Sequence, residues 1–255
     1  MDRVIYTAMN GAARLDEHQS ALVNNMANVN TPGFREQIAM YRSVPLTDSS
    51  DFSSRVATVV ATPGHNFMPG PLQSTGRTLD VAVAGEGWFA VEAPDGQEAY
   101  TRAGNFQIGP DNVLQTAGGR PVLNAQNGPI AIPPSAVMVP SWPIVSVALG
   151  AGDQPNAVVN LGRLKLVALD ERALVHGDDG VFRMAPGPDG EIAAQVADLS
   201  LRVQSGMLEG SNANPMTAMV GMIENARRYE AQMQVMKNVD TNEQRANGIL
   251  STTNG

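Results

Sequence analysis

The sequence predicts an α+β protein. Long N- and C-terminal helices are expected to form a coiled-coil-like domain, and the middle of the chain a mainly antiparallel β domain. Apolar residues recur at heptad spacing near both ends of the chain. In between, short apolar stretches are separated by turn residues roughly every 8–12 positions, as in antiparallel β domains. We therefore predict a helical domain of residues 1–33 and 212–255, extended connectors of residues 34–77 and 202–211, and a β domain of residues 78–201.

The first helix is predicted over residues 2–28, and its apolar positions follow two heptad series. One series contains Ile5, Ala12 and Met26, and the other contains Ala8, Leu15, Leu22 and Val29. The pair Asn10-Gly11 costs about 1 kcal/mol of helix propensity relative to alanine, which does not cancel the pattern. Pro32 disfavours helical geometry at Thr31, and Gly33 offers a left-handed turn, so the helix must end there.

The second helix is predicted to begin at Pro215, with Asn214 as its N-cap. Its heptad series are Met219, Ala226 and Met233, and Met222, Tyr229 and Met236. These methionines could form the core of a local helical hairpin. They could equally form a contact surface between many subunits, because the flexible methionine thioether adapts to several packing arrangements. The sequence leaves both interpretations open.

The middle of the chain is rich in short strands. They are predicted at residues 79–83, 88–92, 99–102, 106–108, 113–115, 121–123 and 158–169. Their spacing and the intervening turns indicate a compact antiparallel sandwich or barrel. Residues 35–76 show no clear period and are expected to be an extended connector.

Composition excludes several functions. The net charge of −8 argues against nucleic acid or an anionic membrane as the main partner. The chain has no cysteine, which rules out disulfides, thiolate nucleophiles and cysteine metal sites. No stretch approaches the roughly 18 consecutive apolar residues that a membrane-spanning helix needs, so membrane insertion is not expected. The first residues do not resemble a secretory signal, so any export is expected to occur without a cleaved leader.

No motif for catalysis or cofactor binding is found. His18, His65 and His176 lie far apart, without further ligands at metal-binding spacing. Residues 85–87 (Gly-Glu-Gly) precede a strand rather than the helix that a phosphate loop requires, so they indicate a hairpin turn. Residues 178–180 (Asp-Asp-Gly) lack the ligand pattern of a calcium loop. We therefore expect no enzyme, no metal, no cofactor and no small-molecule substrate.

The aromatic residues of the middle region allow another function. Trp88, Phe89, Tyr100 and Trp142 could mark a carbohydrate- or peptide-binding β module carried on helical arms. The alternative is that these side chains form the core of the β domain, and we favour it because large aromatic residues dominate such cores.

The two predicted helices carry more apolar surface than they can bury against each other. A pair of helices covers one stripe of each partner. The remaining apolar positions then need further helices; they include Val4, Ala21, Val23, Val220, Ile223, Val235 and Val239. The chain is therefore expected to oligomerise. Heterologous contacts that do not close would give a helical tube or filament.

Three separated blocks resemble the flagellar basal-body rod, hook and hook-associated proteins. The stretch VNNMANVNTPGFR (residues 23–35) is similar to their N-terminal signature, with Val23 and Met26 as mild departures. The stretches LDVA (79–82), GWF (87–89) and AYTRAGNF (99–106) resemble the β domain of rod proteins. Residues 206–215 (GMLEGSNANP) and 222–227 (MIENAR) resemble the C-terminal signature.

This resemblance implies a structural subunit of the basal-body rod. Such subunits assemble with themselves and with other rod subunits into a helical drive shaft that transmits motor torque across the periplasm. The chain is most similar to the proximal rod group, and a distal rod or hook-family subunit is the alternative. The family implies export by the flagellar type III apparatus and terminal helices that form an axial inner tube. Other rod subunits and the export apparatus are the implied partners, with the surrounding ring proteins a weaker expectation.

The heptad series and the two signatures together give a predicted assembly interface. On the N-terminal side it contains Ile5, Ala8, Ala12, Leu15, Leu22, Asn24, Asn25, Met26, Asn28, Thr31, Gly33 and Phe34. On the C-terminal side it contains Asn212, Asn214, Met219, Met222, Ile223, Ala226, Tyr229, Met233 and Met236.

Overall fold

The computed structural model describes residues 2–45, 56–60, 64–134, 136–139, 142–149, 157–186 and 194–252. The chain forms two compact units. The helical unit consists of Met1–Val29, Arg35–Asn66 and Ala213–Gly255, and the β unit consists of Asn30–Phe34 and Phe67–Asn212. Parts of the predicted connector, at residues 46–55 and 61–63, and the last three residues of the predicted helical domain lie outside the described residues.

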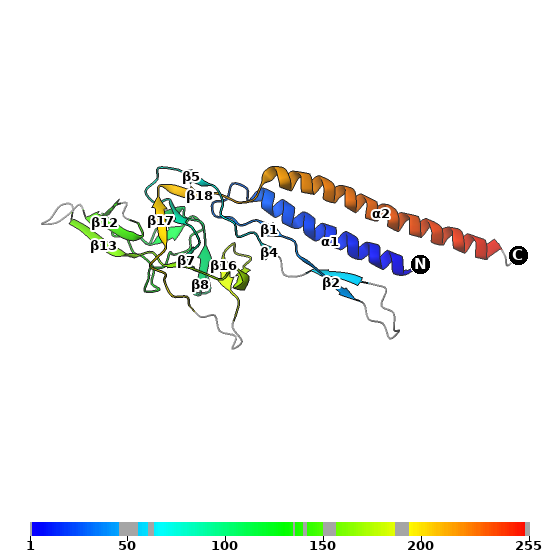
Figure 1. The fold of residues 1–255 in the computed structure, drawn as a ribbon, viewed down its shortest axis with the longest axis horizontal. Helices are drawn as coiled ribbons and strands as arrows, with labels where there is room; N and C mark the ends of the chain where they lie inside the picture. The colour runs from blue at the N-terminus through cyan, green and yellow to red at the C-terminus, as the bar shows by residue number, and fades with distance from the viewer. Residues whose placement is uncertain are drawn as a thin grey trace. The chain divides into compact units, whose positions relative to one another are not determined.

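The helical unit contains α1 (Asp2–Ala27) and α2 (Pro215–Thr252), which run side by side in opposite directions (Figure 1). Their contacts show the antiparallel order. Leu22, near the end of α1, packs against Gly221, near the start of α2, whereas Gly11 faces Gln232. The glycines sit where a side chain of the partner helix comes closest, so the helices approach each other through small residues.

The residues of α2 that face α1 are not those of the predicted heptad series. Ala218 and Asn225 are buried there, while Met219, Tyr229 and Met233 of the predicted series are exposed. The contact thus uses small residues and an amide, and no coiled coil is present in the part of the chain that the structure describes. The prediction of a coiled-coil-like domain is therefore wrong, although long helices do occupy both ends.

The helix termini follow the predicted chemistry. Asn28 caps the C-terminal end of α1: its side-chain Nδ2 donates a hydrogen bond to the backbone oxygen of Asn24 at 3.0 Å. Gly33 has a φ of +70°, the left-handed conformation that the sequence suggested. At the start of α2, the Oδ1 of Asn214 accepts from the backbone nitrogens of Met216 at 2.9 Å and Thr217 at 3.3 Å, which confirms the cap.

Short strands complete the helical unit. Antiparallel pairs are formed by β1 (Gln37–Ile38) with β4 (Gly64–His65), and by β2 (Tyr41–Pro45) with β3 (Val56–Val60). The backbone of this segment is extended because its polar groups are satisfied between strands rather than within a helix.

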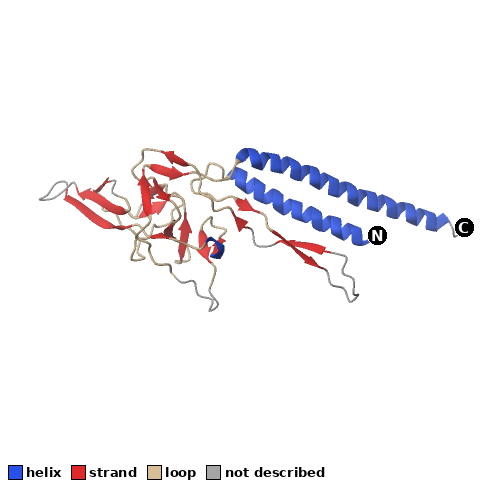
Figure 2. Ribbon diagram, viewed as in Figure 1, coloured by secondary structure: helices blue, strands red, loops and turns tan. Residues whose placement is uncertain are grey.

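The β unit is built from several small antiparallel sheets (Figure 2). The largest has the order β14 (Leu166–Val167), β7 (Trp88–Glu92), β8 (Glu98–Thr101), β16 (Phe182–Met184), β15 (Leu174–His176), and the 3₁₀ turn η1 (Glu171–Ala173) precedes β15. A second has the order β11 (Ala136–Val139), β12 (Ile144–Leu149), β13 (Ala157–Arg163). The remaining pairs are β5 (Leu72–Ser74) with β18 (Met207–Glu209), β6 (Val81–Ala84) with β17 (Arg202–Ser205), and β9 (Phe106–Ile108) with β10 (Leu114–Thr116).

This arrangement corrects the single sandwich or barrel that the sequence suggested. The predicted strand over residues 158–169 is divided between two sheets, because β13 pairs with β12 whereas β14 pairs with β7. The residues between them, Leu164 and Lys165, are both buried. The chain therefore crosses from one sheet to the next through the interior of the unit.

The aromatic residues lie in the core of the β unit. Trp88, Phe89 and Tyr100 are at most 2% exposed. Trp142 is half-buried, and its indole nitrogen donates to the backbone oxygen of Thr78 at 3.0 Å. The core explanation for these side chains is confirmed, and they do not form an exposed platform for a sugar or peptide.

Candidate assembly interface

The structure sorts the predicted interface residues by exposure. Buried are Ala8, Ala12, Asn25 and Gly33; half-buried are Ile5, Leu15, Leu22, Met26, Asn28, Phe34, Asn212, Met222 and Met236; exposed are Asn24, Thr31, Asn214, Met219, Ile223, Ala226, Tyr229 and Met233. The first helix thus turns most of its predicted positions inward, while the second keeps most of its predicted positions in solvent. Thr31, Gly33, Phe34 and Asn212 belong to the β unit, and the others belong to the helical unit.

The second asparagine of the N-terminal signature fixes β1 to α1. The side-chain Nδ2 of Asn25 donates to the backbone oxygen of Gln37 at 2.9 Å, and its Oδ1 accepts from the backbone nitrogen of Gln37 at 2.8 Å. Asn25 is 3% exposed, so its amide is satisfied by this one residue in a buried site. The pairing explains why the segment after α1 returns along the helix.

A second buried amide fixes the register of the two helices. Asn225 on α2 donates from Nδ2 to the backbone oxygen of Leu15 at 2.7 Å and to the Oε1 of Gln19 at 2.9 Å. Its Oδ1 lies 3.4 Å from the Nδ1 of His18. Sliding either helix along the other would leave these buried polar groups without partners, which is costly. The sequence prediction did not include Asn225, because an asparagine within a helical pattern is ordinarily exposed.

An apolar surface lies on the opposite side of α2. Met216, Met219, Val220 and Ile223, which we call the outer patch, are 67%, 42%, 53% and 56% exposed. They follow the spacing i, i+3, i+4 and i+7, so they share one face of the helix. The first turns of α2 are therefore apolar on two faces, of which α1 covers one. Met216 was absent from the predicted set because it belongs to neither heptad series.

In the β unit, the end of the N-terminal signature packs against the start of the C-terminal one. The backbone nitrogen of Gly33 donates to the backbone oxygen of Glu209 at 2.8 Å, and that of Asn212 donates to the oxygen of Phe34 at 3.4 Å. A Cβ placed on Gly33 would lie 2.3 Å from the backbone nitrogen of Ala103. Only glycine fits this close approach.

A buried ion pair lies beneath this contact. Arg102 and Glu209 are 5% and 2% exposed, and the Nη1 of Arg102 lies 3.3 Å from the Oε2 of Glu209. The Oε1 of Glu209 accepts from the backbone nitrogen of Gly70 at 3.0 Å, and the Arg102 guanidinium lies 5.4 Å from the ring centre of Trp88. In the sequence, both residues stand out only as members of the stretches that resemble the family. Their pairing across the chain has no local sequence signal.

Burial shifts the pKa of two titratable groups among the described residues. The Nζ of Lys165 lies 2.7 Å from the Oε1 of Glu98, and burial together with this carboxylate raises the pKa of the Tyr100 hydroxyl. Burial lowers the pKa of His176. Among the described residues, no cluster of histidine and acidic side chains is suited to hold a metal ion. No helix in that part of the chain combines the length and apolar character needed to cross a bilayer.

Comparison with known proteins adds a decisive observation. The chain is 44% identical over 252 residues to the flagellar basal-body rod protein FlgF of Salmonella typhimurium, covering 98% of this chain and 99% of the relative. The chain belongs to the FlgF family of flagellar basal-body rod proteins. It is 43% identical over the same shares of both chains to FlgF of Escherichia coli. The rod protein FlgG of Borreliella burgdorferi is 28% identical, with 94% of this chain and 96% of the relative covered.

Family models match three parts of this rod protein. Residues 5–35 match the flagella basal body rod protein model, residues 82–144 the D1 domain of the flagellar hook protein FlgE/F/G, and residues 204–249 the C-terminal region of the flagellar basal body rod FlgEFG protein. The matches fall on the three blocks that the sequence singled out. The rod protein is thus a structural subunit of the flagellar basal body, and its family is not a class of enzymes.

Proposed function

We propose that the helical unit of this rod protein joins neighbouring rod subunits into the helical drive shaft that carries motor torque, in the proximal part of the rod. Membership of the FlgF family supports the proximal position. The proposal also assigns other rod subunits as the direct partners, because the exposed apolar residues of the helical unit need a protein surface to cover them.

One observation carries the proposal: α2 keeps large apolar side chains in solvent. Besides the outer patch, Tyr229 and Met233 are 43% and 46% exposed. On α1, Tyr6 and Met9 are 70% and 53% exposed. A helix pair with apolar residues outside its own contact gains further stabilisation only by packing against other helices. Methionine suits such contacts because it adapts to partners that are not identical.

We therefore divide the predicted interface residues into two groups. Ala8, Ala12 and Asn25 shape the subunit itself, because they are buried within the helical unit. The exposed members make the contacts between subunits; they are Asn24, Thr31, Asn214, Met219, Ile223, Ala226, Tyr229 and Met233. The half-buried members on the two helices, Ile5, Leu15, Leu22, Met26, Met222 and Met236, contribute to both.

Family membership alone supports two further parts of the proposal. The subunit is exported by the flagellar type III apparatus, and the surrounding ring proteins face the assembled rod. An export assay in strains with and without the apparatus tests the first part, since the chain should reach the periplasm only when the apparatus is present. Cross-linking of the chain to ring proteins in isolated basal bodies tests the second.

The assembly role is tested by complementing a strain that lacks the gene. The unchanged chain should restore swimming and be present in purified basal bodies. Met233→Asp should abolish both, because it places a charge in a subunit contact. Gln234→Asp is the matched control, since it introduces the same residue at the neighbouring exposed, polar position and should preserve swimming.

Two results would contradict the proposal. One is the absence of the unchanged chain from basal bodies of a swimming strain. The other is normal rod assembly by Met233→Asp. Circular dichroism and tryptophan fluorescence of both purified variants show whether the chain still folds, so a loss of assembly can be separated from a loss of structure.

A further inference from the structure

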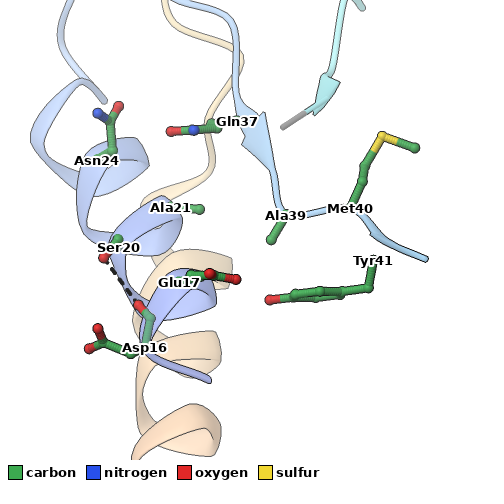
Figure 3. A pocket seen from close by; sticks show the side chains of 9 residues that line it. All are labelled: Asp16, Glu17, Ser20, Ala21, Asn24, Gln37, Ala39, Met40 and Tyr41. Carbon is green, nitrogen blue, oxygen red and sulfur yellow. Dashed lines mark hydrogen bonds between the residues drawn. The ribbon is translucent and has the colours of Figure 1, made fainter. Parts of the chain in front are cut away.

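The helical unit contains a groove between α1 and the segment that returns along it (Figure 3). Ala21 lines the wall that α1 provides, and Met40 and Tyr41 line the opposite wall. Glu17 also lines the groove, but its carboxylate is already paired with Arg14 at 2.7 Å, so its charge is not available to a ligand. The groove therefore singles out no ligand, whereas the β unit contains a cluster of side chains that can react with one another.

A buried lysine of the β unit contacts both a carboxylate and an amide. Lys165 is 1% exposed, and its Nζ lies 2.7 Å from the Oε1 of Glu98 and 2.8 Å from the Oε2. The same Nζ donates to the Oδ1 of Asn127 at 2.6 Å. The neighbouring Tyr100 is fully buried, and burial together with the Glu98 carboxylate raises the pKa of its hydroxyl. The lysine and the carboxylate thus lie where water screens charges only weakly.

Backbone hydrogen bonds hold the lysine and the amide in place. The backbone nitrogen of Lys165 donates to the backbone oxygen of Leu123 at 3.0 Å, and its backbone oxygen accepts from the nitrogen of Ala90 at 3.1 Å. Asn127 lies in a turn in which its backbone nitrogen donates to the oxygen of Asn124 at 2.9 Å. Its φ of +64° is a conformation that asparagine tolerates better than most residues. Because both backbones are fixed, little entropy is lost when the two side chains react.

The lysine nitrogen lies within reach of the amide carbon of Asn127. A C=O bond is about 1.23 Å long, so a nitrogen 2.6 Å from Oδ1 is at most about 3.8 Å from Cγ. This is close to the separation of ~3–3.5 Å from which reacting atoms attack. A lysine becomes a nucleophile when a neighbouring base removes its proton, and Glu98 is in direct contact with Nζ. Proton transfer to Glu98 also replaces two buried charges by neutral groups.

The turn disfavours the reaction that asparagine ordinarily undergoes before a glycine. In that reaction the backbone nitrogen of the glycine attacks the side-chain amide and forms a succinimide. Here the backbone nitrogen of Gly128 donates to the Oδ1 of Asn124 at 3.0 Å, so its N–H is directed at a different side chain. Asn127 itself is exposed, which lets a displaced ammonium ion leave into solvent. The amide of Asn127 is therefore placed to react with the lysine.

We infer that Lys165 and Asn127 form an isopeptide bond once the β unit has folded, with Glu98 as the proton carrier. Glu98 accepts a proton from the lysine ammonium, the Nζ lone pair attacks Cγ of Asn127, and the bond between Cγ and Nδ2 breaks. Glu98 passes the two protons that Nζ loses to Nδ2, which leaves as an ammonium ion. One ammonium group and one primary amide thus become one secondary amide and one ammonium ion, so atoms and charge balance without an oxidant or a co-reactant. The bond lies in the β unit and goes beyond the proposed assembly role.

Intact-mass spectrometry of the purified, folded chain tests the bond directly. The wild-type chain should be lighter than its sequence by the mass of one ammonia molecule. Lys165→Arg keeps the positive charge beside Glu98 but supplies no nucleophilic amine, so it should have the full mass of its sequence. Lys237→Arg is the matched control, because it replaces the only other lysine, an exposed residue of α2, and should lose ammonia as the wild type does.

Two mass results would overturn the inference. One is a wild-type mass equal to that of the sequence, and this result needs no variant, so misfolding of a variant cannot produce it. The other is a loss of ammonia that persists in Lys165→Arg, which would identify a succinimide. Either result leaves the proposed assembly role intact, because that role concerns the helical unit.

Amine labelling in denaturant gives an independent readout. An acylating reagent should modify Lys237 but not Lys165, whose nitrogen has become an amide. Denaturant would release a lysine held only by an ion pair, so equal labelling of the two lysines would contradict the bond. Glu98→Gln removes the base, and Lys165 should then be labelled as fully as Lys237. Continued protection of Lys165 in this variant would exclude Glu98 as the proton carrier.

The stability of the β unit supplies a third readout. The bond joins residues 38 positions apart in the sequence, and closing a loop of this length restricts the unfolded chain as a disulfide does. Asn127→Gly keeps the left-handed turn but removes the amide, and it should lower the Tm by about 10 °C. A decrease of only about 2–4 °C would correspond to one lost hydrogen bond and would contradict a covalent link.

Discussion

Replacing Gly33 with alanine should destabilise the β unit far more than an ordinary glycine substitution. Gly33 has a φ of +70°, and an added Cβ would lie 2.3 Å from the nitrogen of Ala103 and 2.4 Å from the carbonyl carbon of Arg102. Both contacts are with backbone, which cannot rotate away as a flexible side chain can. The turn would have to move, and the hydrogen bond from Gly33 to Glu209 would be lost.

The expected cost is about 3 kcal/mol. A left-handed conformation costs alanine about 1–2 kcal/mol, of which about 0.5 kcal/mol is offset by the lower entropy of the unfolded chain. The lost hydrogen bond adds about 1 kcal/mol. Displacement of packed backbone adds about another 1 kcal/mol, which is typical of overpacking. For a unit of this size, 3 kcal/mol corresponds to a decrease in Tm of about 6–12 °C.

Gly76→Ala is the matched control. Gly76 has a φ of +71°, but an added Cβ there would meet nothing within 4 Å. It should therefore cost only the conformational part, about 1 kcal/mol. Urea unfolding followed by tryptophan fluorescence measures both variants, since Trp88 and Trp142 belong to the β unit. Equal losses of stability in the two variants would refute the argument that close packing selects glycine at position 33.

Three further predictions concern polar side-chain contacts. Asn225→Ala should cost about 2 kcal/mol through the loss of two hydrogen bonds, and amide hydrogen exchange of α2 should accelerate while the β unit keeps its unfolding midpoint. Arg102→Met should cost about 3–5 kcal/mol by removing the cation from buried Glu209, and a second substitution, Glu209→Leu, should recover part of that loss in urea unfolding. Hydrogen bonds from Arg183 lower the pKa of Asp179 below its ordinary value of 3.8, so the ionised carboxylate stabilises the folded chain. This stabilisation is complete above the ordinary pKa and is lost as the pH falls through the lower pKa of the folded state. Asp179→Asn should therefore flatten the fall of Tm below about pH 4; an unchanged slope would contradict the assignment.

Local chemistry made the helix boundaries predictable. The left-handed Gly33 ends the first helical segment, and Asn214 with Pro215 starts the second, because these residues act on their own backbone or on the next few residues. Strands β6 to β10 were predicted for the same reason, since alternation and turn residues are short-range signals, whereas β5, β11, β12 and β15 to β18 were not. The strand predicted over residues 158–169 is divided, because its crossing between sheets depends on burial of Leu164 and Lys165 in tertiary structure.

Which face of a helix meets which partner was not predictable from spacing. The first turns of α2 present two apolar faces, and the heptad pattern selected Met219 where the structure selects Ala218 and Gly221. Small residues form the contact between α1 and α2 because they allow the helices to approach closely. A pattern based on large apolar residues does not detect this effect. The pairing of Arg102 with Glu209 was hidden for a different reason: the two lie far apart in sequence, and neither local pattern points to the other.

The division of the chain also sets an order of folding. α1 and α2 belong to one unit, yet the whole β unit is inserted between them in the sequence. To pair the helices directly, an unfolded chain would have to close a loop of roughly 190 residues, an entropic cost of about 4–5 kcal/mol. Once the β unit has folded, most of that loop is already closed. If the chain is exported from its N-terminus, as proposed, α1 would stay unpartnered until α2 emerged, and the two helices would pair only after export.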